Sequence, residues 1–120
     1  MTRLPLVFTA ISNIWLVVFW SETVERDLAA DVPGLGPRLV LTALAAGGLY
    51  VFGMTLNDVM DLRRDRALAP TRPLAAGRLR PATALMTALV ALLIAVAASV
   101  PLGMMPALFC LGCAGLIVLY

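Results

Sequence analysis

The fold is decided by residues 39–65, LVLTALAAGGLYVFGMTLNDVMDLRRD, in which an uncharged apolar run leads directly into a cluster of charges. The run from Leu39 to Leu56 is long enough to cross the hydrocarbon core of a bilayer as a helix. It contains small residues of the kind that let membrane helices pack closely, namely Ala45, Gly47, Gly48 and Gly53. A spanning helix is therefore expected to deliver the charged residues to the membrane surface.

Three of the chain's seven acidic residues fall within residues 57–65, NDVMDLRRD. On an α-helix, Asp58, Asp61 and Asp65 would point in directions about 60° or less apart and would share one face. Such carboxylates repel one another unless a cation binds them. Oxygen ligands suit Mg²⁺, which keeps several waters and completes its shell with substrate phosphates. The motif therefore predicts a magnesium–diphosphate site with these three aspartates as metal ligands, and Ca²⁺ binding or a solvated helix end are the alternatives.

The composition of the whole chain indicates a membrane protein. Of its 120 residues 62% are hydrophobic and 13% charged, and the mean hydropathy is +0.97, far above that of a soluble domain. The net charge is only +2, and no nucleic-acid partner is predicted. All nine basic residues are arginine and there is no histidine, which excludes histidine metal sites and Ser-His or Cys-His catalysis. Cys110 and Cys113 are interpreted as small buried thiols rather than a redox pair or part of a zinc site.

The apolar runs predict an all-α fold, a polytopic bundle of four transmembrane helices. The predicted spans are residues 4–20, 39–56, 82–100 and 103–120, with a motif loop at 57–81. Residues 21–38 carry four acids and the sequence Pro-Gly-Leu-Gly-Pro, which predicts a solvated loop, and Pro101-Leu102-Gly103 predicts a tight break.

Asn13 lies inside the first apolar run, where an amide is costly in hydrocarbon. We expect it to face either a neighbouring helix, through an interhelical hydrogen bond, or a substrate cavity. Both interpretations stay open at the level of the sequence.

The distribution of arginines predicts the orientation. Six arginines lie between the second and third predicted spans, whereas the segment between the first two holds two arginines against four acids. The positive-inside rule then places the N-terminus and the motif loop on the cytoplasmic side of a bacterial-type plasma membrane. Four of the arginines are interpreted as topology determinants or contacts to membrane lipid headgroups, namely Arg63, Arg64, Arg78 and Arg80.

Residues 57–65, NDxxDxxxD, followed by residues 72–77, RPLxxG, resemble the first aspartate-rich motif and the following loop of the UbiA superfamily of intramembrane prenyltransferases. The placement of the motif at the end of the second spanning helix is also similar. The resemblance implies that Mg²⁺ bridges the carboxylates and the diphosphate of a polyprenyl donor. The C–O bond then ionises, and a lipophilic, often aromatic, acceptor attacks the allylic cation.

The resemblance also implies a role for each matching position. Asp58, Asp61 and Asp65 would be catalytic, metal-binding acids. Asn57 and Arg72 would contact the diphosphate of the donor, and Asn13 would contribute to the same cavity.

The chain departs from the superfamily in its extent. Members of the superfamily form a larger helical bundle with a second aspartate-rich motif. This chain resembles only the first four helices and the first motif of such a bundle. A clamp that holds metal ions from both sides needs the second motif. We therefore predict that the 120-residue polypeptide alone is inactive. A truncated product, a fragment, and one half of a split pair in which a second chain supplies the missing helices are the interpretations left open. Prenyl transfer by the purified chain in lipid would contradict this prediction.

Three other interpretations compete with a prenyltransferase. CDP-alcohol phosphotransferases also place aspartates on membrane helices, but their pattern has a glycine after the first acid, where this chain has Val59. Soluble isoprenyl diphosphate synthases use similar aspartate clusters, and the membrane-length apolar runs argue against that class. A non-enzymatic four-helix membrane protein, in which the acids cap a helix and balance the arginines, is the alternative of a different class.

Overall fold

The computed structural model describes residues 4–24, 34–68, 71 and 73–119, and every regular element in this part of the chain is helical. The elements are α1 (Leu4–Val24), α2 (Leu35–Met60), α3 (Leu62–Leu68), α4 (Pro81–Ser99), the 3₁₀ turn η1 (Val100–Leu102) and α5 (Met104–Leu119). The predicted all-α class is confirmed.

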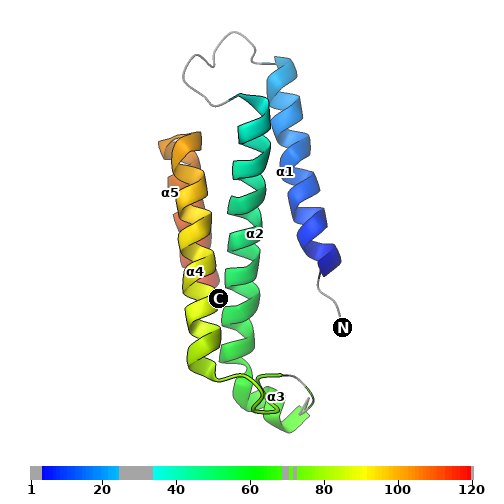
Figure 1. Ribbon diagram of the computed structural model, residues 1–120, viewed down its shortest axis with the longest axis vertical. Helices are drawn as coiled ribbons and strands as arrows, with labels where there is room; N and C mark the ends of the chain where they lie inside the picture. Colours follow the sequence, from blue (N-terminus) through cyan, green and yellow to red (C-terminus); the bar gives the residue numbers. More distant parts are fainter. Residues whose placement is uncertain (1–3, 25–33, 69–70, 72, 120) are drawn as a thin grey trace.

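The four long helices form an elongated up-and-down bundle of 56 × 24 × 21 Å (Figure 1). The central helix is α2, which contacts α1, α4 and α5, and its contact with α4 is the most extensive. Among the described elements, α1 contacts α2 alone. The short helix α3 lies at the lower end of the bundle in Figure 1, below α2. The end of α2 and the start of α4 are therefore brought to the same end of the molecule.

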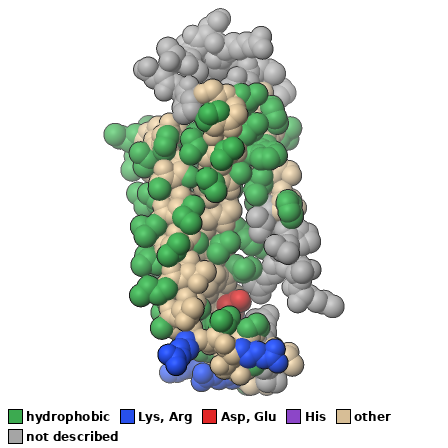
Figure 2. All heavy atoms as spheres, viewed as in Figure 1, with side chains coloured by type: hydrophobic (Ala, Val, Ile, Leu, Met, Phe, Trp, Pro, Cys, Tyr) green, Lys and Arg blue, Asp and Glu red, His purple; other side chains and the backbone are tan. Residues whose placement is uncertain are grey.

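Two helical stretches are long and apolar enough to cross a membrane, Leu35–Met60 and Pro81–Leu102. Two further apolar stretches, Phe8–Phe19 and Met104–Leu119, are shorter. The second and third predicted spans thus have the required length and composition, whereas the first and fourth stay predictions. Large apolar side chains such as Phe109 of α5, 74% exposed, cover the sides of the bundle. Figure 2 shows these side chains along the body and the arginines at the lower end, an arrangement that suits lipid around the sides.

Small residues allow α2 and α4 to pack closely. The buried side chains of α4 are almost all alanine, and Ala88 and Ala91 share a cluster with Phe52 of α2. A Cβ atom added to Gly48 would lie 2.6 Å from the carbonyl oxygen of Ala91 and 3.0 Å from the Cβ of Ala95. Glycine at position 48 is therefore required by the close approach of the two backbones.

The other small residues of α2 have different surroundings. A Cβ on Gly53 would lie 3.4 Å from the side chain of Ile117 in α5, so this glycine also lies at a helix contact. A Cβ on Gly47 would meet no heavy atom of the described residues within 4 Å. The predicted packing role is thus confirmed for Gly48 and Gly53 and is wrong for Gly47.

Two predicted boundaries are wrong at the ends of α2. Leu35 to Arg38, predicted as part of a loop, form the first turn of the helix. Pro37 is tolerated there because the N–H groups of a first turn have no partner within the helix. At the other end, residues 57–60 belong to α2 and residues 62–68 form α3, so much of the predicted motif loop is helical.

Two local predictions near α5 agree with the structure. The tight break after α4 is present, because Val100–Leu102 form a 3₁₀ turn and Gly103 has a φ of 120°. Cys110 is buried, Cys113 is partly buried, and both are free thiols.

Candidate functional site

The acidic motif crosses the junction between α2 and α3. Asn57 and Asp58 lie in the last turn of α2, Asp61 is the residue between the two helices, and Asp65 lies in α3. The backbone N–H of Asp61 donates to the carbonyl of Asn57 at 2.9 Å, and that of Asp65 donates to the carbonyl of Asp61 at 2.8 Å. The helical hydrogen-bond spacing is kept, while Asp61 departs from helical geometry with φ −78° and ψ 0°. The three carboxylates therefore stand on two helical segments rather than on one straight helix.

The three aspartates are partly buried, although they lie at the end of the molecule. The Oδ1 atom of Asp58 is shielded from solvent. The exposed side chain of Asn57 donates a hydrogen bond from Nδ2 to Oδ2 of Asp61, at 3.3 Å. Two of the predicted site residues are thus in contact, and the amide of Asn57 orients one carboxylate.

The aspartates do not form a ready-made metal cage. Within the described part of the chain, no three or more His, Cys, Asp or Glu side chains are grouped so that they could hold one metal ion. Mg²⁺ is usually bound by one or two carboxylates together with substrate phosphates and waters. Carboxylates spread over two helical segments, with an amide beside them, fit a cation that arrives with a diphosphate better than a cation held by protein alone.

The turn that precedes α4 explains the glycine of the RPLxxG sequence. The N–H of Gly77 donates to the carbonyl of Leu74 at 3.2 Å, and the N–H groups of Arg78 and Leu79 donate to the carbonyl of Pro73 at 3.0 and 3.3 Å. Gly77 has a φ of 72°, which is unfavourable for residues with a Cβ atom. Arg72, predicted to contact a diphosphate, lies outside the described residues.

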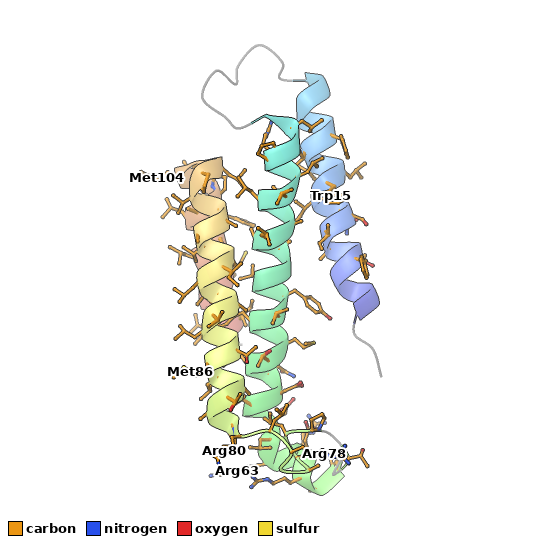
Figure 3. All side chains as sticks on the ribbon, in the orientation of Figure 1. Trp15, Arg63, Arg78, Arg80, Met86 and Met104 are labelled. Carbon is orange, nitrogen blue, oxygen red and sulfur yellow. The ribbon has the colours of Figure 1, made fainter. Side chains whose placement is uncertain are left out.

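The arginines at this end of the molecule differ from the aspartates in exposure. Figure 3 shows Arg63, Arg78 and Arg80 at the lower end of the bundle, around α3 and the turn before α4. All three are exposed, as are Arg64 and Arg66 of α3. The surface of this end is therefore basic, while its acids are partly buried.

Asn13 lies elsewhere, in an open apolar groove of about 1280 Å³ between α1, α2 and α5. Thr42 of α2 lines the same groove, and Trp15 donates from Nε1 to the carbonyl of Leu39 at 3.0 Å, which holds α1 against the first half of α2. About 24 Å of helix separates Thr42 from Asp58, at 1.5 Å per residue. The structure therefore brings Asn57 and the aspartates to one end and places Asn13 along the other half of α2.

Sequence reasoning expected Asn13 to face a neighbouring helix or a cavity, but it did not predict where this groove lies or which helices line it. It exists because α1 and α5 both pack on α2 and make no contact with each other among the described elements. Small residues on the lining surfaces, Ala45 and Ala46 on α2 and Gly112 on α5, leave the space between them. A run of small residues along one side of α2 is the signal that could have indicated it.

The fold and the site together define a class, a helical membrane protein with a carboxylate site at one end of its central apolar helix. The sequence model of the UbiA prenyltransferase family matches residues 6–120, and the chain belongs to this membrane-embedded family.

A curated relative supports this assignment. A digeranylgeranylglyceryl phosphate synthase from Sulfolobus acidocaldarius is 39% identical over 70 residues, which are 58% of this chain and 24% of the relative. The match thus spans about a quarter of the relative's length. No solved structure is significantly similar to the chain.

Proposed function

We propose that this chain acts in an intramembrane prenyltransferase that moves a polyprenyl group from its diphosphate to a lipophilic acceptor, with Mg²⁺ as the cofactor. Family membership supports the reaction class. The observation that carries the assignment of the site is the group of three partly buried aspartates and Asn57 at the end of a membrane-length helix. Such a location lets the diphosphate lie at the membrane surface while the prenyl chain extends along apolar helices.

In this proposal the residues of the chain bind and orient the donor. Asp58, Asp61 and Asp65 would hold a cation that binds together with the diphosphate. Asn57 orients the carboxylate of Asp61 through its 3.3 Å hydrogen bond to Oδ2. Arg72 supplies a second, guanidinium contact to the diphosphate. When bound, Mg²⁺ neutralises the charge that develops on the leaving diphosphate.

Two chemical classes of acceptor are consistent with the proposal. An aromatic ring is the acceptor implied by the resemblance, whereas the relative is named for a product that joins geranylgeranyl groups to glyceryl phosphate. Both an aromatic lipid and a glyceryl phosphate lipid are therefore acceptors to test. We further propose that the motif faces the cytoplasm, because the arginines concentrate at the same end.

Binding of the donor tests the site without depending on the acceptor. The chain is reconstituted in lipid nanodiscs, and binding of radiolabelled geranylgeranyl diphosphate is measured with Mg²⁺ and with EDTA. We expect binding with Mg²⁺ only, and a loss of roughly 10- to 100-fold in Asp61→Asn, since a contact to a charged group contributes about 1.5–3 kcal/mol.

Asp31→Asn is the matched control, because it makes the same chemical change in the segment of sequence between α1 and α2. This control should bind the donor as tightly as the wild type. Binding that persists in EDTA, or an equal loss in Asp31→Asn and Asp61→Asn, would show that the motif is not the metal–diphosphate site.

A further inference from the structure

The end of the molecule that carries the acidic motif has an outer surface of arginines that the proposed reaction does not use. Three of them are on α3 and two precede α4, and all are exposed, whereas the aspartates beside them are partly buried. These five arginines are Arg63, Arg64, Arg66, Arg78 and Arg80. Because the arginines are exposed and the aspartates are partly buried, the two sets of charges are suited to two different binding partners.

Large apolar side chains are interspersed among these arginines. Leu68 is 73% exposed, Met60 62% and Leu79 48%. In water such exposure is unfavourable, but at a membrane surface the apolar side chains can enter the acyl boundary while guanidinium groups remain among the headgroups. We name the five arginines together with Met60, Leu68 and Leu79 the basic collar.

The position of the basic collar along the bundle matches the headgroup layer. Arg80 precedes the first residue of α4, and Leu85 and Met86, 47% and 66% exposed, begin the apolar outer side of that helix. Five residues of helix cover about 8 Å. A headgroup region is about 5–8 Å thick on each side of the hydrocarbon core. Figure 2 shows the same continuity, with arginines directly below the apolar sides.

We propose that the basic collar binds the anionic phospholipid headgroups of the leaflet on the motif side. Arginine presents a planar fork of donors to a phosphate oxygen pair, and an anionic headgroup lacks the compensating cation of phosphatidylcholine. The partner is a lipid surface rather than the prenyl diphosphate, because these arginines are exposed, whereas the carboxylates proposed for the metal and diphosphate are partly buried.

Native mass spectrometry of the detergent-solubilised chain tests this proposal. Binding of phosphatidylglycerol is compared with binding of phosphatidylcholine that has the same acyl chains. The wild type should bind phosphatidylglycerol in preference. The triple variant Arg63→Gln/Arg78→Gln/Arg80→Gln should lose about fivefold in affinity for each arginine, roughly 100-fold in all.

Matched variants test whether lipid binding depends on the basic collar or on positive charge anywhere in the chain. Arg38→Gln, an arginine in the first turn of α2 at the opposite end of the bundle, should keep the preference for phosphatidylglycerol. Arg63→Lys/Arg78→Lys/Arg80→Lys should keep most of it, because the charge is retained. If the glutamine variant loses its helical circular dichroism, the salt dependence of phosphatidylglycerol binding to the wild type decides, and binding should fall as salt rises.

Three results would overturn the proposal. The first is an equal affinity of the wild type for both lipids. The second is an equal loss in Arg38→Gln and in the triple glutamine variant. The third is displacement of phosphatidylglycerol by inorganic pyrophosphate with Mg²⁺, which would assign the arginines to the diphosphate site instead.

Discussion

At the scale of single residues, two adjacent glycines of α2 differ in what surrounds them. Gly48 faces the backbone of α4, where an added Cβ would lie 2.6 Å from the carbonyl oxygen of Ala91, whereas Gly47 has open space around it. The difference cannot be read from the sequence, because the two glycines are adjacent. Which of them faces α4 depends on the rotation of α2 about its axis, and packing decides that rotation.

Substitution of these two glycines tests the packing of α2 against α4. Gly48→Ala should destabilise the fold by about 1–3 kcal/mol, the usual cost of overpacking a close contact. Gly47→Ala should be neutral or stabilising by up to about 1 kcal/mol, since alanine is the better helix former. Reversible unfolding in detergent, followed by circular dichroism, measures both. Equal stability of the two variants would contradict the packing described for α2 and α4.

The roles predicted for the site residues stay predictions, and the structure bears only on where these residues lie. The contact between Asn57 and Asp61 follows from their spacing of four residues on a helix, and the structure contains it. The separation of Asn13 from the aspartates was not predictable, because it depends on how far α1 is shifted along α2. The hydrogen bond from Trp15 to the carbonyl of Leu39 is consistent with that shift.

At the scale of elements, the existence and order of the helices followed from hydrophobicity, while their ends did not. The apolar run predicted α2 from residue 39 to residue 56, and the helix extends from Leu35 to Met60. The predicted helix ended at residue 56 because the next residues are polar, but neither Asn57 nor Asp58 prevents a helix from continuing. Pro37 likewise fits a first turn.

The turn formed by residues 73–79 depends on the left-handed conformation of Gly77. Gly77→Ala should cost about 1–2 kcal/mol in this turn, and the adjacent arginines should then become more accessible to a protease. We expect faster tryptic cleavage at Arg78 than in the wild type, measured by mass spectrometry of timed digests; the Arg80–Pro81 bond resists trypsin in both proteins. Ala76→Ser, an exposed position in the same turn, is the control and should be cleaved at the wild-type rate.

At the scale of the whole molecule, the arrangement of the long helices brings the acidic motif and the basic collar to one end. Because α4 returns from that end, η1 lies at the opposite end of the bundle (Figure 1). If α4 crosses the membrane, η1 and α3 must face opposite sides. The orientation that we propose from the positive-inside rule would then put α3 on the cytoplasmic side.

Cysteine labelling tests this topology. In a Cys110→Ser/Cys113→Ser background, Arg64→Cys in α3 should react with a membrane-impermeant maleimide from the cytoplasmic side only. Val100→Cys in η1, where the side chain is 59% exposed, should react from the external side only. Labelling of both positions from the same side would show that α4 does not span the membrane.

The central claim is the proposal that the acidic motif binds a metal ion and a diphosphate together, through partly buried aspartates at the end of a membrane-length helix. Electron paramagnetic resonance with Mn²⁺ in place of Mg²⁺ tests it most directly, in nanodiscs that contain the chain with and without geranylgeranyl diphosphate. We predict weak binding of Mn²⁺ alone, tight binding in the presence of the diphosphate, and loss of the tight binding in Asp58→Asn/Asp61→Asn. Tight binding without the diphosphate, or tight binding that survives in this double variant, would contradict the account.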